Sequence, residues 1–338
     1  MKAFVGYLCV MFCCSLCISC QEQANVLVRF TGSTQGTYYA VTYYEHQGKS
    51  YQKEIDSLLV RFDKSVSLWD SASVISRINR NDENAQADEV FAKLFQLSKE
   101  VHLKSGGAFD PTVGPLVNAW GFGFKEKMKV DQRVVDSLLQ LVGFEMVKLE
   151  NGNVSKFDPR VQFDFNAIAQ GYSVDLVGGF LLQKGIKNYL VDIGGEVKTK
   201  GYKPGGELWQ VGIERPRDHA TYGEGLTAIV KLTDKALSTS GSYRKFYIVD
   251  GKRYSHTIDP KTGYPVQHSL LSVSVLADEC AMADAWATVF MVWGFEKSRD
   301  FLETQNVLQA FFIYADSVKG TQTYNTPGFD KFLVEEMR

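Results

Sequence analysis

The chain has 338 residues, of which 45% are hydrophobic and 22% are charged, and its formal net charge is −2. This length suffices for one large hydrophobic core, and the composition is that of a globular protein. The small negative charge excludes a basic footprint for nucleic acid or for a membrane surface, so we expect no nucleic-acid partner.

The first twenty residues have the composition of an export signal. Lys2 precedes an uncharged run over 3–18, which is too short to span a bilayer comfortably. Ser19 stands directly before Cys20, as a small residue does before the lipidated cysteine of a bacterial lipoprotein. Cys17 occupies a position where such signals usually have Leu. The alternative is an ordinary cleaved signal in which the cysteine is incidental.

These features predict the domain organisation of the chain. We expect a lipoprotein signal peptide over 1–19, a lipid-modified Cys20, a tether over 20–30 and one folded domain over 31–338. Five of the six cysteines lie at or before Cys20, so Cys280 has no partner for an internal disulfide in the mature chain. The expected membrane attachment is therefore the N-terminal lipid anchor.

Strand-like and helix-like apolar spacings alternate along the rest of the chain. The predicted helices lie around 55–62, after a serine cap within 71–73, and over 89–105, 164–185 and 280–295. The predicted strands are a hairpin over 26–44 with its turn at 32–36, and segments at 161–165, 189–193, 208–214, 226–232, 235–241, 245–259 and 270–277. With no linker or repeat, this predicts one compact α+β domain of mixed and antiparallel strands with flanking helices.

A glycine-rich loop, GGAFDPTVGPLVNAWGFG, follows the predicted helix over 89–105. Glycines permit a close backbone approach, and Asp110 in such a loop could accept a hydrogen bond from a ligand. The alternative is a well-packed connector in which Asp110 caps its own backbone.

The start of the helix over 164–185 is a second candidate site. Asp164 and Asn166 stand where exposed backbone N–H groups favour an anion such as phosphate. Gly171 within the helix indicates that something approaches it closely. The alternative is an ordinary Asp or Asn cap with a glycine at a helix–helix contact.

Asp284 is the sharper candidate, because its neighbours on the predicted helix are apolar on every side. Such a helix is buried, and a buried unpaired carboxylate is costly. Thr288 lies one turn further on the same face, so the pair offers hard oxygen ligands suited to Mg²⁺. The alternative is an arginine or backbone partner for Asp284.

His256, with Asp259 three residues on, is a candidate base or phosphate donor. The alternative is a structural histidine on a strand.

Six ordered blocks together resemble the FAD:protein FMN transferases of the ApbE family. The blocks are GGAFDPTVGPLVNAWGFG, DFNAIAQGYSVD, DIGGE at 192–196, STSGSYRKF, SHTIDPKTGYPV and ADAWAT. The resemblance covers the chain from about residue 32 to its C-terminus. It implies an α+β fold, FAD as donor, Mg²⁺ as metal, and transfer of FMN to a Thr or Ser hydroxyl of an acceptor flavoprotein with release of AMP. It also implies a lipid-anchored place in the bacterial cell envelope, facing the periplasm, with the inner membrane as the expected site.

The resemblance also assigns residues. It implies metal ligation by the backbone oxygen of Ala167 and the side chains of Asp284 and Thr288. An incoming hydroxyl needs a base or a polarising acceptor, and His256 is our candidate for this catalytic role, with Asp284 holding the metal. The implied FAD contacts are Gln35, Trp69, Ala108, Phe109, Asp110, Asp164, Gln170 and His256.

Three of these positions depart from the family pattern. Gln35 stands where Met is frequent, Gln170 where Lys or Glu is frequent, and Trp69 where Tyr is frequent. Two other functions need the same pocket: a Mg²⁺-dependent FAD pyrophosphatase, with water as acceptor, and a non-catalytic FAD-binding lipoprotein.

Overall fold

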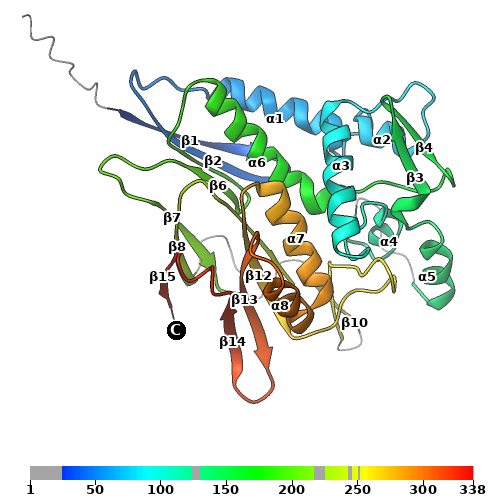
Figure 1. Ribbon diagram of the computed structural model, residues 1–338. Helices are drawn as coiled ribbons and strands as arrows, with labels where there is room; N and C mark the ends of the chain where they lie inside the picture. Colours follow the sequence, from blue (N-terminus) through cyan, green and yellow to red (C-terminus); the bar gives the residue numbers. More distant parts are fainter. Residues whose placement is uncertain (1–24, 124–129, 217–224, 243–245, 250–251, 338) are drawn as a thin grey trace, which may run out of the picture.

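An eight-stranded sheet forms the centre of the molecule (Figure 1). The computed structural model describes residues 25–123, 130–216, 225–242, 246–249 and 252–337. Neighbouring strands in the large sheet are all antiparallel. In spatial order they are β1 (Val26–Thr34), β2 (Thr37–Glu45), β5 (Tyr189–Ile193), β6 (Glu196–Lys200), β9 (Ala236–Gly241), β12 (Leu270–Ala277), β13 (Gln309–Asp316) and β14 (Gly320–Asn325).

The remaining described strands form three smaller sheets. They are the sheet of β15 (Leu333–Glu336), β8 (Leu226–Leu232) and β7 (Trp209–Glu214), the hairpin of β3 (Val147–Glu150) and β4 (Asn153–Lys156), and the hairpin of β10 (Phe246–Val249) and β11 (Lys252–Ser255).

Helices cover one face of the large sheet and one end of the molecule (Figure 1). They are α1 (Gln52–Val66), α2 (Val74–Asn79), α3 (Glu89–Lys104), α4 (Gly114–Ala119), α5 (Gln132–Leu139), the 3-10 turn η1 (Phe144–Met146), α6 (Asn166–Gln183), α7 (Cys280–Trp293) and α8 (Phe295–Glu303). Among the described residues, none of these helices has the length and apolar character needed to cross a bilayer.

Alternation along the central strands gives the large sheet two buried faces. Val275 of β12 and Phe312 of β13 pack in the cluster that contains α7. Their neighbours Leu276 and Phe311 face the other way and pack with Val230 of β8. The helices α6 and α7 therefore lie on one face of the sheet, and the small sheet of β7, β8 and β15 lies on the other.

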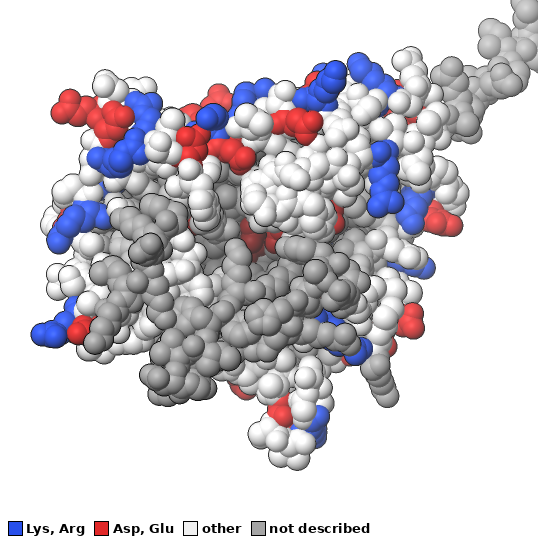
Figure 2. All heavy atoms as spheres, turned by 180° about the vertical axis from the view of Figure 1, so that it is seen from behind, with Lys and Arg blue, Asp and Glu red and all other residues white. Residues whose placement is uncertain are grey.

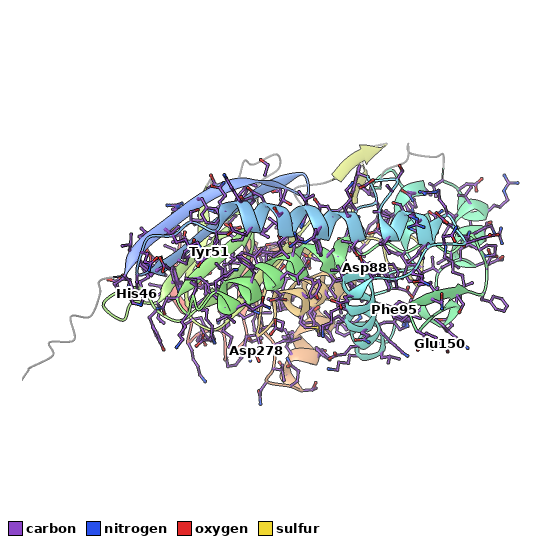
Figure 3. All side chains as sticks on the ribbon, turned by 90° about the horizontal axis from the view of Figure 1, so that it is seen from above. His46, Tyr51, Asp88, Phe95, Glu150 and Asp278 are labelled. Carbon is purple, nitrogen blue, oxygen red and sulfur yellow. The ribbon has the colours of Figure 1, made fainter. Side chains whose placement is uncertain are left out.

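An aromatic cluster joins α3 to the start of α6. The ring of Phe91 meets those of Phe163 and Phe165 edge to face, with centroid distances of 5.4 and 5.1 Å. Seen from above, His46 and Tyr51 mark one end of the molecule and Asp88, Phe95 and Glu150 the other (Figure 3). The cluster packs the residues that directly precede α6 against α3 and so positions the start of α6.

Most predicted elements are confirmed, including the α+β class and the antiparallel strands. The hairpin is present, with its turn confined to Gln35 and Gly36, and Ser73 caps α2 by accepting from the backbone N–H of Ser76 at 3.2 Å. The predicted strand over 161–165 is wrong, because only Gln162 pairs there, in an isolated bridge to Val113. A single bridge does not make a β-strand, and the segment leads directly into α6.

The predicted leader lies outside the described residues, including Cys20 and the first part of the tether. The last five residues of the predicted tether, 26–30, are part of β1 and pair with β2. Buried Val28 and Phe30 make this segment part of the fold.

Candidate active site

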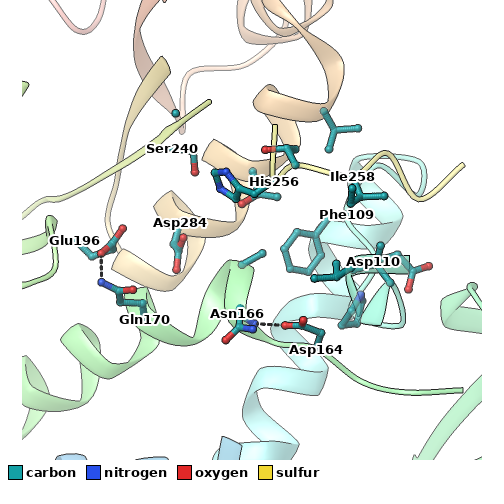
Figure 4. A pocket seen from close by; sticks show the side chains of 18 of the residues that line it. Phe109, Asp110, Asp164, Asn166, Gln170, Glu196, Ser240, His256, Ile258 and Asp284 are labelled. Carbon is teal, nitrogen blue, oxygen red and sulfur yellow. Dashed lines mark hydrogen bonds between the residues drawn. The ribbon is translucent and has the colours of Figure 1, made fainter. Parts of the chain in front are cut away.

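A cavity of about 420 Å³ lies at one end of the large sheet, between strand ends and the helices α6 and α7. That volume suits a small-molecule ligand. Figure 4 shows Asp284 of α7 facing the same space as His256 and Gln170. The structure brings nearly all of the predicted site residues to this wall: Gln35, Ala108, Phe109, Asp110, Asp164, Ala167, Gln170, His256, Asp284 and Thr288.

Two tight turns of the large sheet form part of the wall. Gln35 and Gly36 at the tip of the β1–β2 hairpin have φ of 51° and 73°, the values of a two-residue hairpin turn. Between β5 and β6, Gly194 has φ of 63°, and a Cβ there would lie 2.2 Å from the amide nitrogen of Gln170. Only glycine permits both this backbone conformation and this close packing.

The contact between α6 and α7 places Asp284. A Cβ on Gly171 would lie 2.5 Å from the carbonyl oxygen of Cys280 and 2.8 Å from Cβ of Asp284. The close approach indicated by Gly171 is therefore that of α7. At this distance the backbone N–H of Gly171 donates to a carboxylate oxygen of Asp284 at 3.0 Å. Of the partners considered for Asp284, the structure shows the backbone one.

Asp284 remains an unusual group despite this bond. It is 7% exposed, and burial raises its pKa to about 7. The structure places no Lys or Arg among the described residues that line the cavity with it. A buried carboxylate without a cation is costly, so this position favours either protonation or a bound cation.

Two residues with oxygen atoms suited to a hard cation line the cavity together with this carboxylate. Thr288 and Ala167 line the same cavity as Asp284. In a regular helix the N–H of Gly171 would pair with the carbonyl of Ala167, and here this N–H donates to Asp284. The carbonyl of Ala167 is therefore not the only acceptor for this N–H. Within the described residues no three His, Cys, Asp or Glu side chains gather around a possible metal position. The donor set fits Mg²⁺, which is commonly held by one or two carboxylates together with substrate phosphates and water.

Two further carboxylates of the wall are held by backbone donors. Asp110 accepts from the backbone N–H groups of Thr112 at 2.8 Å and Phe144 at 3.0 Å and from the hydroxyl of Thr112 at 2.6 Å. A ring nitrogen of His102 lies 3.3 Å from the same carboxylate. Asp164 accepts from the N–H of Asn166 at 2.8 Å (Figure 4). Burial raises the pKa of both carboxyls. The capping alternative for each is thus present in the structure, and each also borders the cavity.

Glu196 is a wall residue to which the sequence analysis assigned no role. Its carboxylate accepts from the side-chain amide of Gln170 at 2.5 Å (Figure 4). The same amide also donates to the carbonyl of Ile193 at 2.8 Å. The available signal was its place in the block over 192–196, directly after the glycine turn. Other wall residues without an earlier role include Gly36, Thr37, Thr239, Ser240, Thr257 and Pro260.

His256 follows the last residue of β11 and lines the cavity opposite α6 (Figure 4). Its half-buried ring meets the edge of Phe122 with a centroid distance of 6.4 Å. Its position on the loop that enters the cavity places a titratable group on the wall that also contains Asp284.

Gln35 offers an unused donor to a ligand. Its side-chain nitrogen is buried and has no hydrogen-bond partner among the described residues. A buried unpaired donor is costly, so an acceptor on a bound nucleotide would stabilise it. Trp69 differs from the other assigned residues, since its side chain is 67% exposed and is absent from the described wall. Its FAD contact stays a prediction.

Replacing Gly171 with alanine is expected to destabilise the protein by about 1–3 kcal/mol, because the added methyl group overpacks the contact with α7. Gly179 in the same helix is the matched control, since a Cβ there meets nothing within 4 Å. Gly179→Ala should stabilise by about 0.5–1 kcal/mol. Urea unfolding of both variants measures the difference, and equal effects would contradict the helix contact as the reason for Gly171.

Comparisons with known proteins agree with this geometry. The sequence pattern of the ApbE family matches residues 35–312. The FAD:protein FMN transferase of Vibrio cholerae is 34% identical over 327 residues, which cover 94% of this chain and 96% of the relative. The FAD:protein FMN transferase of Haemophilus influenzae is also 34% identical, with 98% of each chain covered.

Solved structures show the same fold. The flavin transferase ApbE from Vibrio cholerae superposes with a TM-score of 0.81 at 33% identity, covering 91% of this chain and 100% of the other. The apo form of the flavinyl transferase ApbE from Pseudomonas stutzeri gives a TM-score of 0.80 at 33% identity, covering 91% and 97%. A match of this extent in sequence and structure places the chain in the ApbE family.

Proposed function

We propose that this protein is an FAD:protein FMN transferase, which transfers FMN from FAD to a Thr or Ser hydroxyl of an acceptor protein and releases AMP in a Mg²⁺-dependent reaction. The observation that carries the proposal is the single cavity in which Asp284, Ala167, Thr288 and His256 meet. The relatives named for this activity support FAD as the donor.

The charge of the wall supports a cation in the reaction. Asp110, Asp164, Glu196 and Asp284 all line the cavity, and no Lys or Arg does among the described residues. A pyrophosphate is itself anionic, so these carboxylates would repel it in the absence of a cation. Asp284, Thr288 and the carbonyl of Ala167 would hold Mg²⁺. When bound, this ion would neutralise charge on the pyrophosphate as its bond breaks.

The transfer step requires that a proton leave the acceptor hydroxyl. The hydroxyl oxygen attacks the phosphorus of the FMN half, the bond from that phosphorus to the bridging oxygen breaks, and AMP departs with the bridging oxygen. His256 would accept the hydroxyl proton, because a neutral imidazole is a base of suitable strength near neutral pH. Gln35 would donate a hydrogen bond to FAD through its unpaired amide nitrogen.

The acceptor would be a membrane or periplasmic flavoprotein with a short hydroxyl-containing motif. Lys, Arg, Asp and Glu side chains mix along the edge of the face seen in Figure 2, and no broad patch of one sign covers its described part. This mixture favours recognition of a short motif over broad charge attraction.

Mass spectrometry separates the proposed activity from its two alternatives. The protein is incubated with FAD, Mg²⁺ and a candidate acceptor. Transfer adds the mass of FMN, less water, to the acceptor and releases AMP. Free FMN with AMP would instead show a pyrophosphatase, and intact FAD would show binding alone. Either of these two results with an acceptor that a related transferase modifies would contradict the proposal.

Cys20→Ser is expected to release the protein from membranes. We propose that a lipid on Cys20 anchors the protein to the cell envelope facing the periplasm, with the inner membrane as the expected site. The measurement is the share of protein that sediments with membranes after a high-salt wash. Cys9→Ser, which changes a leader cysteine away from the lipidation signal, serves as the control and should remain membrane-bound. If Cys20→Ser still sediments, the lipoprotein signal is wrong.

A further inference from the structure

A buried ion cluster lies where α6, β6 and the start of α7 meet, apart from the described cavity wall. Lys198 donates to Asp175 and to Glu279, each at 2.7 Å. The side chains of Asp175 and Lys198 are only 9% and 15% exposed, whereas Glu279 is 60% exposed. The buried pair is therefore Asp175 and Lys198. A buried pair of this kind is costly to form, so its position calls for an explanation beyond stability.

Asp175 also supplies the cap that α7 lacks locally. The residue before the helix, Glu279, makes no capping hydrogen bond with its side chain. Both oxygens of Asp175 are used instead, one by the backbone N–H of Cys280 and one by that of Ala281, each at 2.9 Å. Two of the free N–H groups at the start of α7 are thus satisfied by a residue of α6.

Two contacts along α6 now hold α7 in place. Asp175 binds its first turn, and Gly171, one turn earlier on the same face of α6, donates to Asp284. Because Asp284 lies one turn beyond Cys280 on α7, the two contacts together set the register of the helices. A shift of α7 by a fraction of a turn would break both.

We propose that Asp175 is a positioning residue, which sets the placement of the carboxylate of Asp284 and the hydroxyl of Thr288 by capping α7 from α6. Lys198 balances the charge of Asp175 without touching the described cavity wall. The inference rests on the proposed function, since it assigns Asp175 to the placement of the metal ligands. Residues that support a metal ligand in this way typically alter metal affinity about 10- to 100-fold when replaced.

The test measures metal affinity directly. The mature chain is titrated with Mn²⁺ alone, and free Mn²⁺ is followed by electron paramagnetic resonance. Asp175→Asn keeps the size of the side chain but offers one acceptor to two donors. We expect its Mn²⁺ affinity to fall about 10- to 100-fold. Lys198→Met keeps both capping bonds and should bind Mn²⁺ as the wild type does.

A matched cap elsewhere separates placement from general stability. Asp88 caps α3 by accepting from the N–H of Phe91 at 2.9 Å, so Asp88→Ala removes a cap away from the cavity. We expect this variant to lose stability without losing Mn²⁺ affinity. If Asp175→Asn is too unstable to purify, Asp175→Asn/Lys198→Met replaces it, since this double variant has no unpaired buried charge.

The outcomes are distinct. Wild-type Mn²⁺ affinity in Asp175→Asn, or its recovery in Asp175→Asn/Lys198→Met, would overturn the inference, because the cap would then be irrelevant. The Asp284→Ala variant serves as the reference for the metal site. If it binds Mn²⁺ like the wild type, the metal ligands of the proposed function are wrong and the inference falls with them. If it alone loses Mn²⁺, only the role of Asp175 is wrong.

Discussion

Asp284→Ala is expected to reduce FMN transfer by well over about 100-fold, since even residues that only support a metal ligand cost about 10- to 100-fold when replaced. The substitution removes the carboxylate of Asp284, which lines the cavity with Thr288 and Ala167. Alanine is a good helix former, so α7 should persist. Transfer is measured by the FMN adduct on the acceptor over a range of Mg²⁺ concentrations. Unchanged Mg²⁺-dependent transfer would show that Asp284 is not a metal ligand.

The stability of metal-free protein provides a control for this result. Burial raises the pKa of Asp284 from 3.8 to about 7, so the folded state binds more protons than the unfolded state between these values. The contribution of Asp284 to the free energy of unfolding therefore falls as the pH rises from about 4 to about 7, and it stays low above pH 7. Asp284→Asn keeps an acceptor for the N–H of Gly171 but does not titrate.

The two proteins should consequently diverge with pH when the metal is removed. In the presence of EDTA, the melting temperature of the wild type should fall relative to that of Asp284→Asn between about pH 4 and about pH 7. Parallel curves would contradict the raised pKa. This comparison also separates the loss of a metal ligand from the loss of the fold. Asp284→Asn lacks the anionic metal ligand, yet we expect it to be more stable than the metal-free wild type at the higher pH.

His256→Ala should lower FMN transfer by about 100-fold or more, the usual scale for the loss of a general base. The affinity for FAD should change far less, because the pyrophosphate contacts proposed for Asp284 and Thr288 through Mg²⁺ remain. FAD dissociation is followed by flavin fluorescence alongside transfer.

The conservative variant His256→Gln distinguishes two roles of the imidazole. Glutamine keeps a hydrogen-bond donor but is no base. If His256 accepts the proton, both variants should lose transfer alike while still binding FAD. If it mainly donates to a phosphate, His256→Ala should lose binding and transfer together, and His256→Gln should recover much of both. Near-normal transfer in His256→Ala would return this residue to a structural role.

Local patterns determined much of the fold from the sequence. The hairpin of β1 and β2, the cap at Ser73 and the buried helix α7 each depend on residues a few positions apart. Asp284 stood out because a carboxylate among apolar neighbours is costly wherever that helix packs. The spacing of Asp284 and Thr288 on one helix face already suggested a metal site. The assignment of Ala167 and the set of FAD contacts came from the resemblance in six blocks, and most of these residues border one cavity.

The tertiary structure decided what no local pattern contains. The order of strands in the large sheet places β6 beside β9 and β9 beside β12, pairs far apart in the chain. The segment over 161–165 has a strand-like pattern but forms no strand, since only Gln162 makes a β-bridge, to Val113.

The same reason applies to the candidate site. Gly171 was read from sequence as a close approach, but only packing shows that α7 is the approaching element and that Asp284 takes its N–H. The cap from Asp175 to Cys280 spans more than one hundred residues of chain, with a separation of 105. The sequence therefore determines which groups are available for chemistry. Whether these groups come together in one site depends on the register of α6 against α7. That register is set by long-range contacts, and neither segment alone contains a pattern that predicts it.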